Sequence, residues 1–169
     1  MGICNKDNSS LGHKPIPLET ANELSKSICK ITINNNGGEK FGTGFFMIYE
    51  PLKLLITNYH IISRELINND IELEIASIKM ILHLDYSSRY IQFFEKPIDI
   101  TVIEIKDSDP IPKEIKFLSY DKNCLDGNYS QYVNLDLICS GCPFGQKLSF
   151  QSGIINKINN FEFEIGRAS

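Results

Sequence analysis

Short apolar runs separated by polar turns fill most of the chain. The runs are rich in isoleucine and aromatic residues, and clusters of Asn, Gly, Pro, Asp and Ser bound them, as is typical of strands and turns. The sequence predicts strands over residues 27–33, 42–48, 53–57, 71–77, 90–95, 98–105, 115–120, 133–140, 148–158 and 161–165. Short strands at this spacing predict an all-β fold of the sandwich or barrel type and argue against a parallel α/β sheet.

Helical patterns are few in the same sequence. The best helix candidate is the segment 19–27, and a single helical turn is expected at 63–66, just after a histidine. A polar, proline-bearing link at 106–114 divides the predicted strands into two series.

Composition and charge limit the classes of partner. The chain has 169 residues, of which 42% are hydrophobic and 22% charged, the balance of a globular protein with a packed core. The net charge is -4, so no positive field favours nucleic acid or anionic lipid as a partner. We find neither a secretion signal nor an apolar run long enough to span a bilayer, which predicts a cytoplasmic protein without stable membrane insertion. Gly2 and Cys4 resemble an acylated amino terminus, although Lys6 stands where the myristoylation pattern has Ser or Thr.

Candidate metal ligands are sparse. The five cysteines are scattered through the sequence, and free thiols are expected. Cys139 and Cys142 form a C-x-x-C pair, which fits half a zinc site, a redox pair or two strand-end thiols, but no second C-x-x-C or histidine pair accompanies it. We therefore expect no metal and no cofactor. His83 is expected as a surface or strand-edge residue, and Asp85 beside it as a turn former.

One histidine and one aspartate are better placed for chemistry. His60 lies in LLITNYHII, residues 54–62, where an apolar run ends in a turn, and it is expected at a strand end. Asp99 is a lone carboxylate in a later apolar strand, and burying its charge requires a cationic or hydrogen-bonding partner. His60 is the natural candidate for that partner. The alternatives are a histidine held by local hydrogen bonds and an exposed aspartate capped by backbone amides. Upstream, Gly42 and Gly44 open an apolar strand, where they allow either close approach by a neighbouring segment or φ values that side chains forbid.

Several motifs in order give the sequence a family resemblance. They are GTGFF (42–46), LLITNYHII (54–62), PIDITVIEI (97–105), GCPFG (141–145) and SGII (152–155). In this order and with these gaps they resemble the trypsin-like (chymotrypsin-fold) serine peptidases of the intracellular type. The resemblance runs from about residue 28 to about residue 163.

The resemblance implies a fold and a mechanism. The fold would be two antiparallel β-barrels, at 27–107 and 108–169, after an N-terminal extension at 1–26, with the active site in the cleft between them. His60 would be the general base that takes a proton from a serine hydroxyl, and Asp99 the carboxylate that fixes the histidine tautomer. The substrate would be a polypeptide.

The sequence departs from the family at the nucleophile. The motif Gly-x-Ser-Gly is absent from these 169 residues, and Ser169 is poorly suited to replace it, because its own carboxylate would repel an oxyanion. The second barrel is therefore expected to be incomplete. Two interpretations stay open: a serine endopeptidase whose last part is missing from this sequence, and an inactive pseudopeptidase that binds extended peptide along a strand edge.

Overall fold

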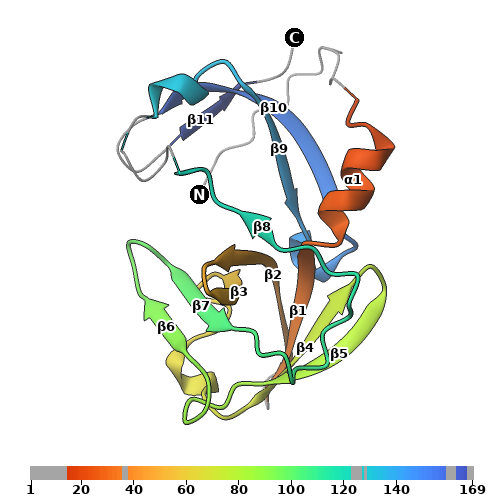
Figure 1. The fold of residues 1–169 in the computed structure, drawn as a ribbon, viewed down its shortest axis with the longest axis vertical. Helices are drawn as coiled ribbons and strands as arrows, with labels where there is room; N and C mark the ends of the chain where they lie inside the picture. The colour runs from red at the N-terminus through yellow and green to blue at the C-terminus, as the bar shows by residue number, and fades with distance from the viewer. Residues whose placement is uncertain (1–14, 36–37, 123–126, 128, 159–162, 167–169) are drawn as a thin grey trace.

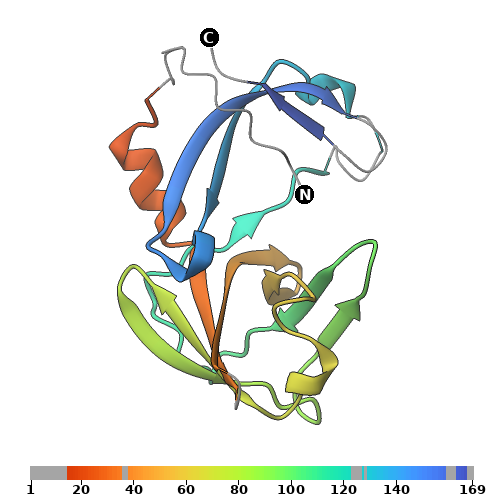
Figure 2. The same cartoon turned by 180° about the vertical axis from the view of Figure 1, so that it is seen from behind.

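Two β-sheets build the protein. The computed structural model describes residues 15–35, 38–122, 127, 129–158 and 163–166. Figure 1 shows the larger sheet in the lower half of the molecule and the smaller sheet in the upper half, and Figure 2 shows both from behind. The all-β prediction is confirmed.

The larger sheet has the strand order β5-β4-β1-β2-β3-β7-β6, with neighbours antiparallel, and β8 pairs with β2 in parallel. Its strands are β1 (Ile28–Asn35), β2 (Gly38–Tyr49), β3 (Leu52–Thr57), β4 (Asp70–Ile75), β5 (Ile78–His83), β6 (Ile91–Phe94), β7 (Ile100–Glu104) and β8 (Leu118–Ser119). Among the described residues no ladder joins the end strands β5 and β6, so the sheet curves without closing by hydrogen bonds.

The smaller sheet is antiparallel, in the order β11-β10-β9. It consists of β9 (Asp136–Gly141), β10 (Ser149–Ile158) and β11 (Phe163–Gly166), with the 3₁₀ turns η3 (Ser130–Tyr132) and η4 (Pro143–Gly145) beside them. Three strands form an open sheet in the part of the chain that the structure describes, in the region where the sequence predicts an incomplete barrel.

The core lies inside the larger sheet because its strands alternate in polarity. In β4, Ile71, Leu73 and Ile75 are buried while Glu72 and Glu74 face outward. Phe46 of β2 is fully buried and meets the ring of Phe117 edge to face, with ring centroids 5.8 Å apart. Burying each such side chain stabilises the fold by about 1.5–3 kcal/mol.

The helices are short and close to their predicted positions. Helix α1 covers Leu18–Ser25, against the predicted 19–27, and the 3₁₀ turn η1 covers Arg64–Leu66, against the predicted 63–66. None of the helices within the described ranges is long and apolar enough to cross a membrane.

The largest differences from the sequence prediction are at β5 and β8. Strand β5 was not predicted, because the turn before it consists of Ala76 and Ser77, both with positive φ, where Gly or Asn would have marked a hairpin. The strand predicted at 115–120 shrinks to β8, since Ile115 and Phe117 pack on the larger sheet's core instead of extending a ladder. β8 thus joins the larger sheet, although its residues fall in the segment assigned to the second barrel.

A buried ion pair fastens the link after β7 to the larger sheet. Two nitrogens of Arg89 donate to the two carboxylate oxygens of Asp109, each at 2.7 Å, and both side chains are more than nine-tenths buried. Asp109 also accepts a hydrogen bond from the backbone N–H of Lys106 at 2.7 Å. This pair fixes the path of the chain where it leaves the larger sheet.

Candidate functional site

The turn after β3 carries His60 out of the sheet. Strand β3 ends at Thr57, and the carbonyl of Asn58 then accepts hydrogen bonds from the N–H groups of Ile61, at 3.0 Å, and Ile62, at 3.1 Å. Ile61 and Ile62 are buried, whereas 58% of the His60 side chain is exposed. The apolar residues behind the histidine therefore anchor the turn and leave the imidazole accessible, at a strand end as predicted.

Asp99 lies just before β7 and not within a strand, which corrects the predicted strand 98–105. Its φ is +58°, a left-handed conformation that Asp tolerates better than most residues. Its N–H donates to the carbonyl of Glu95 at 3.2 Å, and its carbonyl accepts from the N–H of Tyr59 at 3.1 Å. The Asn58 amide donates to the same carbonyl at 3.3 Å. The two turns are thus bonded to each other through their backbones.

The structure brings His60 and Asp99 together. Nδ1 of His60 lies 2.5 Å from Oδ2 of Asp99, and the backbone N–H of His60 donates to Oδ1 at 2.8 Å. The carboxylate is therefore held at both oxygens by one residue, and 23% of its side chain is exposed. When the carboxylate is ionised, Nδ1 must carry the proton of this hydrogen bond, so Nε2 of a neutral imidazole is left as a proton acceptor.

The electrostatics keep Asp99 ionised. Partial desolvation opposes its charge, but the hydrogen bonds from the His60 side chain and backbone outweigh this effect, and the pKa of the carboxyl is lowered. Lys96 adds a smaller attraction in the same direction. The site therefore holds a negative charge against one nitrogen of an exposed imidazole, an arrangement suited to accepting a proton at the other nitrogen.

The glycines of the GTGFF stretch allow close packing against the histidine turn and against β3. A Cβ on Gly42 would lie 2.5 Å from a side-chain carbon of Ile61, the residue after His60. A Cβ on Gly44 would lie 2.8 Å from Leu55 of β3. Of the two roles that the sequence predicts for these glycines, the structure shows close packing.

Thr43, between those glycines, links β3 to the residue that follows β9, a role that the sequence does not reveal. Its carbonyl accepts a hydrogen bond from the hydroxyl of Thr57 at 2.8 Å. Its own hydroxyl accepts one from the N–H of Cys142, also at 2.8 Å. Thr43 occupies the variable position of a Gly-x-Gly pattern, so its type alone gives no signal of this contact.

The other candidates do not gather into a site. Cys139, Cys142 and Cys29 are free thiols, and no group of three metal-type ligands occurs among the described residues. His83 is paired with Asp70 of the neighbouring strand, with Nδ1 and Oδ1 2.7 Å apart, and both are exposed.

Asp85 accepts hydrogen bonds from the N–H and hydroxyl of Ser87, as expected of a turn former. Gly2, Cys4 and Ser169 lie outside the described residues.

Comparison with solved structures identifies the fold. No family model matches the sequence, and no curated protein matches it. Among solved structures, a serine endoprotease from Yersinia pestis aligns with a TM-score of 0.56 at 14% identity, over 90% of this chain and 54% of that one. The HtrA-type protease AlgW, with a tripeptide, aligns with a TM-score of 0.54 at 17% identity, over 86% of this chain and 43% of that one. The chain thus spans about half the length of these proteases, and over that span it has the fold of the trypsin-like (chymotrypsin-fold) serine proteases.

Proposed function

We propose that this chain supplies the general base and its orienting carboxylate to a serine endopeptidase. The observation that carries the proposal is the contact of His60 Nδ1 with Asp99 Oδ2 at 2.5 Å, with the second carboxylate oxygen held by the His60 N–H. This arrangement leaves Nε2 of His60 exposed as a proton acceptor. The fold shared with serine proteases supports the same interpretation.

In the proposed mechanism each residue has one role. Nε2 of His60 takes the proton of a serine hydroxyl as its oxygen attacks the carbonyl carbon of a peptide bond. Asp99 stays ionised and stabilises the imidazolium that forms, and the imidazolium then gives its proton to the leaving amine. The lowered pKa of Asp99 agrees with this role, because a protonated carboxyl could not stabilise the positive charge.

The proposed substrate is a polypeptide. One of the structural neighbours, AlgW, is described with a tripeptide, and the proposal extends that class of ligand to this chain. The attacking serine is not assigned, because no Gly-x-Ser-Gly motif occurs in the 169 residues.

A second candidate function is a pseudopeptidase that binds peptide without cleaving it, and the open edges of the three-stranded sheet in the described residues favour it. The edges of the smaller sheet would then provide the main-chain hydrogen bonds for an extended peptide. His60 and Asp99 would remain as a structural pair.

One experiment separates the two functions. The transcript is read through the codon for Ser169, the complete reading frame is expressed, and cleavage of a fluorogenic peptide library is measured. For a peptidase, His60→Ala should reduce kcat/KM by about 10²- to 10⁴-fold, the usual contribution of a general base. His83→Ala is the matched control, since His83 also pairs with an aspartate but lies elsewhere on the larger sheet. Cleavage that survives His60→Ala unchanged would contradict the peptidase proposal, and a reading frame that ends at Ser169 with no cleavage would favour the binding module.

A further inference from the structure

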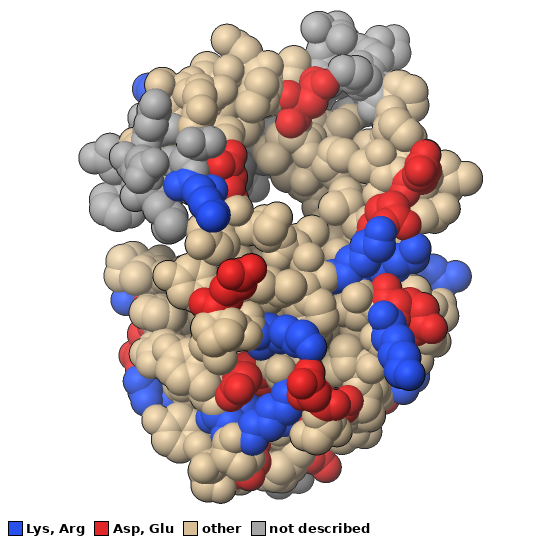
Figure 3. Space-filling model, in the orientation of Figure 1, with Lys and Arg blue, Asp and Glu red and all other residues tan. Residues whose placement is uncertain are grey.

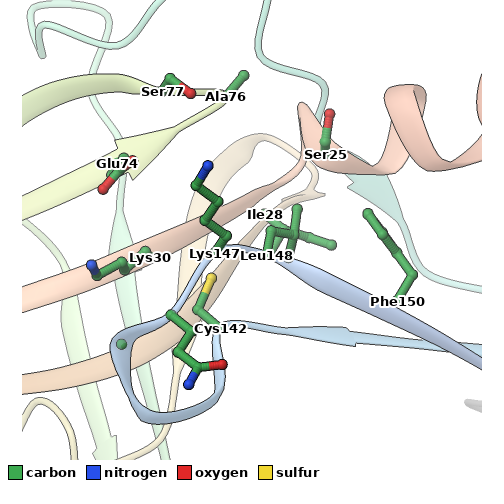
Figure 4. Close-up of a pocket in the computed structure, with 12 residues that line it drawn as sticks. Ser25, Ile28, Lys30, Glu74, Ala76, Ser77, Cys142, Lys147, Leu148 and Phe150 are labelled. Carbon is green, nitrogen blue, oxygen red and sulfur yellow. The ribbon is translucent and has the colours of Figure 1, made fainter.

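A cavity of about 510 Å³ lies between the two sheets. Its walls come from the end of α1, from β1, from the β4–β5 hairpin and from the segment that joins β9 to β10 (Figure 4). His60 and Asp99 do not line it. The volume falls within the range of about 300–1,000 Å³ that small-molecule sites occupy.

One side of this cavity is apolar. Ile28 of β1, Leu148 of the joining segment and Phe150 of β10 form this wall, and Figure 4 shows them together on one side. The Cys142 thiol lies beside them, and desolvation raises its pKa, so it remains an uncharged group. This wall suits an aliphatic or aromatic moiety.

The other side is polar and has a net positive charge. Lys30 and Glu74 lie there, directly opposite each other in the ladder of β1 and β4, so their charges offset one another. The ammonium of Lys30 is also engaged over the ring of Phe41, 5.0 Å from its centroid. Lys147 makes no ion pair or hydrogen bond within the described ranges, and in Figure 4 its side chain extends between Cys142 and the turn of Ala76 and Ser77. Lys147 is therefore the cation available to a ligand.

The tip of the β4–β5 hairpin, at the edge of the cavity, is strained: Ala76 and Ser77 have φ values of +47° and +73°, although both bear side chains. Such conformations destabilise by about 1–2 kcal/mol per residue and persist where the surroundings enforce them. The Ser77 hydroxyl lies at the edge of the cavity. On the face of the molecule drawn in Figure 3, Lys and Arg side chains are interspersed with Asp and Glu side chains at the waist.

From these observations we infer that the cavity binds a small organic carboxylate that carries an apolar group. The carboxylate lies against Lys147 with Ser77 as a further donor, and the apolar group packs on Ile28, Leu148 and Phe150. Two sources share this chemistry: a free carboxylic acid, and a peptide whose carboxyl terminus follows an apolar residue. The inference does not depend on the proposed peptidase function, because neither residue of the His60–Asp99 pair takes part.

The test uses four probes on the isotope-labelled chain. The probes are 4-phenylbutyrate, its neutral amide, acetyl-Ala-Phe with a free carboxyl terminus, and the same dipeptide amidated. Nuclear magnetic resonance shifts give both the affinity and the place of binding. We expect at least one acid to shift the resonances of residues 74–77 and 145–150 and to bind at least about fivefold tighter than its amide, the effect of one partly exposed charge contact.

Two lysine variants test whether the charge of Lys147 contributes to binding of the acid. Lys147→Gln should weaken the acid about fivefold and leave the amide unchanged. Lys79→Gln is the matched control, because Lys79 is an exposed lysine of β5 that pairs with Glu72 and does not line the cavity. If 4-phenylbutyrate binds and acetyl-Ala-Phe does not, the ligand is a free carboxylic acid. If acetyl-Ala-Phe binds and 4-phenylbutyrate does not, the ligand is the carboxyl terminus of a peptide. Equal affinity of acid and amide, shifts confined to other surfaces, or no binding of any probe would overturn the inference.

Discussion

We predict that loss of the buried ion pair between Arg89 and Asp109 strongly destabilises the fold. Asp109→Ala would remove both carboxylate oxygens, each 2.7 Å from a guanidinium nitrogen, and leave a positive charge at a site where 6% of the arginine side chain is exposed. Removing one partner of a buried pair destabilises by about 3–5 kcal/mol, because the remaining charge loses its compensation. For a chain of this length that corresponds to a decrease in Tm of roughly 6–20 °C.

A neighbouring pair provides the control for this prediction. Asp107 pairs with Lys53 at 2.7 Å, but 90% of its side chain is exposed, so Asp107→Ala should destabilise by less than about 1 kcal/mol. Both variants are measured by urea unfolding, followed by two spectroscopic probes to confirm a two-state transition. If the two variants lose similar stability, or if Asp109→Ala loses less than about 1 kcal/mol, the assignment of Arg89–Asp109 as the anchor of the link is refuted.

Two other predictions concern packing and pH. Gly42→Ala should destabilise by about 1–3 kcal/mol, because its Cβ would lie 2.5 Å from Ile61; equal or greater stability in urea would contradict this close packing. Asp85 should titrate with a pKa of about 2, since hydrogen bonds from Ser88 and Ser87 favour its ionised form. A folded-state pKa below the unfolded value stabilises the fold above the unfolded pKa, and this contribution is lost as the pH falls towards 2. The pKa of Asp85 is measured from its carboxyl resonance as a function of pH. An ordinary aspartate pKa would contradict the hydrogen bonds from Ser87 and Ser88 to this carboxylate.

Much of the fold can be predicted from the sequence because its strands are apolar runs bounded by turn residues. In β4 the apolar and polar residues also fall on opposite faces, so the sequence pattern and the burial agree. In β7 they do not, because Thr101 is buried on the same face as Ile103. Strand β5 escapes prediction because Ala76 and Ser77 adopt left-handed conformations that neither residue type favours. The turn is therefore determined by the packing of the whole hairpin and not by the local preferences of Ala76 and Ser77.

The candidate site was predictable as a pair of residues but not in its geometry. The strand end at His60 and the lone carboxylate of Asp99 both stand out in the sequence. The left-handed backbone of Asp99 does not, and neither does the hydrogen bond from the His60 N–H to its Oδ1. Both depend on contacts between turns that are 39 residues apart. The role of Thr43 is hidden for the same reason, since its partner Cys142 follows β9, 99 residues further along the chain.

The proposed function requires that Asp99 hold His60 ready to accept a proton at Nε2. Nitrogen chemical shifts of labelled histidine, recorded at a pH where the imidazole is neutral, report which ring nitrogen bears the proton. We expect His60 to carry it on Nδ1, and we expect Asp99→Asn to shift the population towards the Nε2-protonated form, because the anionic acceptor is lost. A His60 protonated mainly on Nε2, with a tautomer ratio unchanged by Asp99→Asn, would contradict the proposed function.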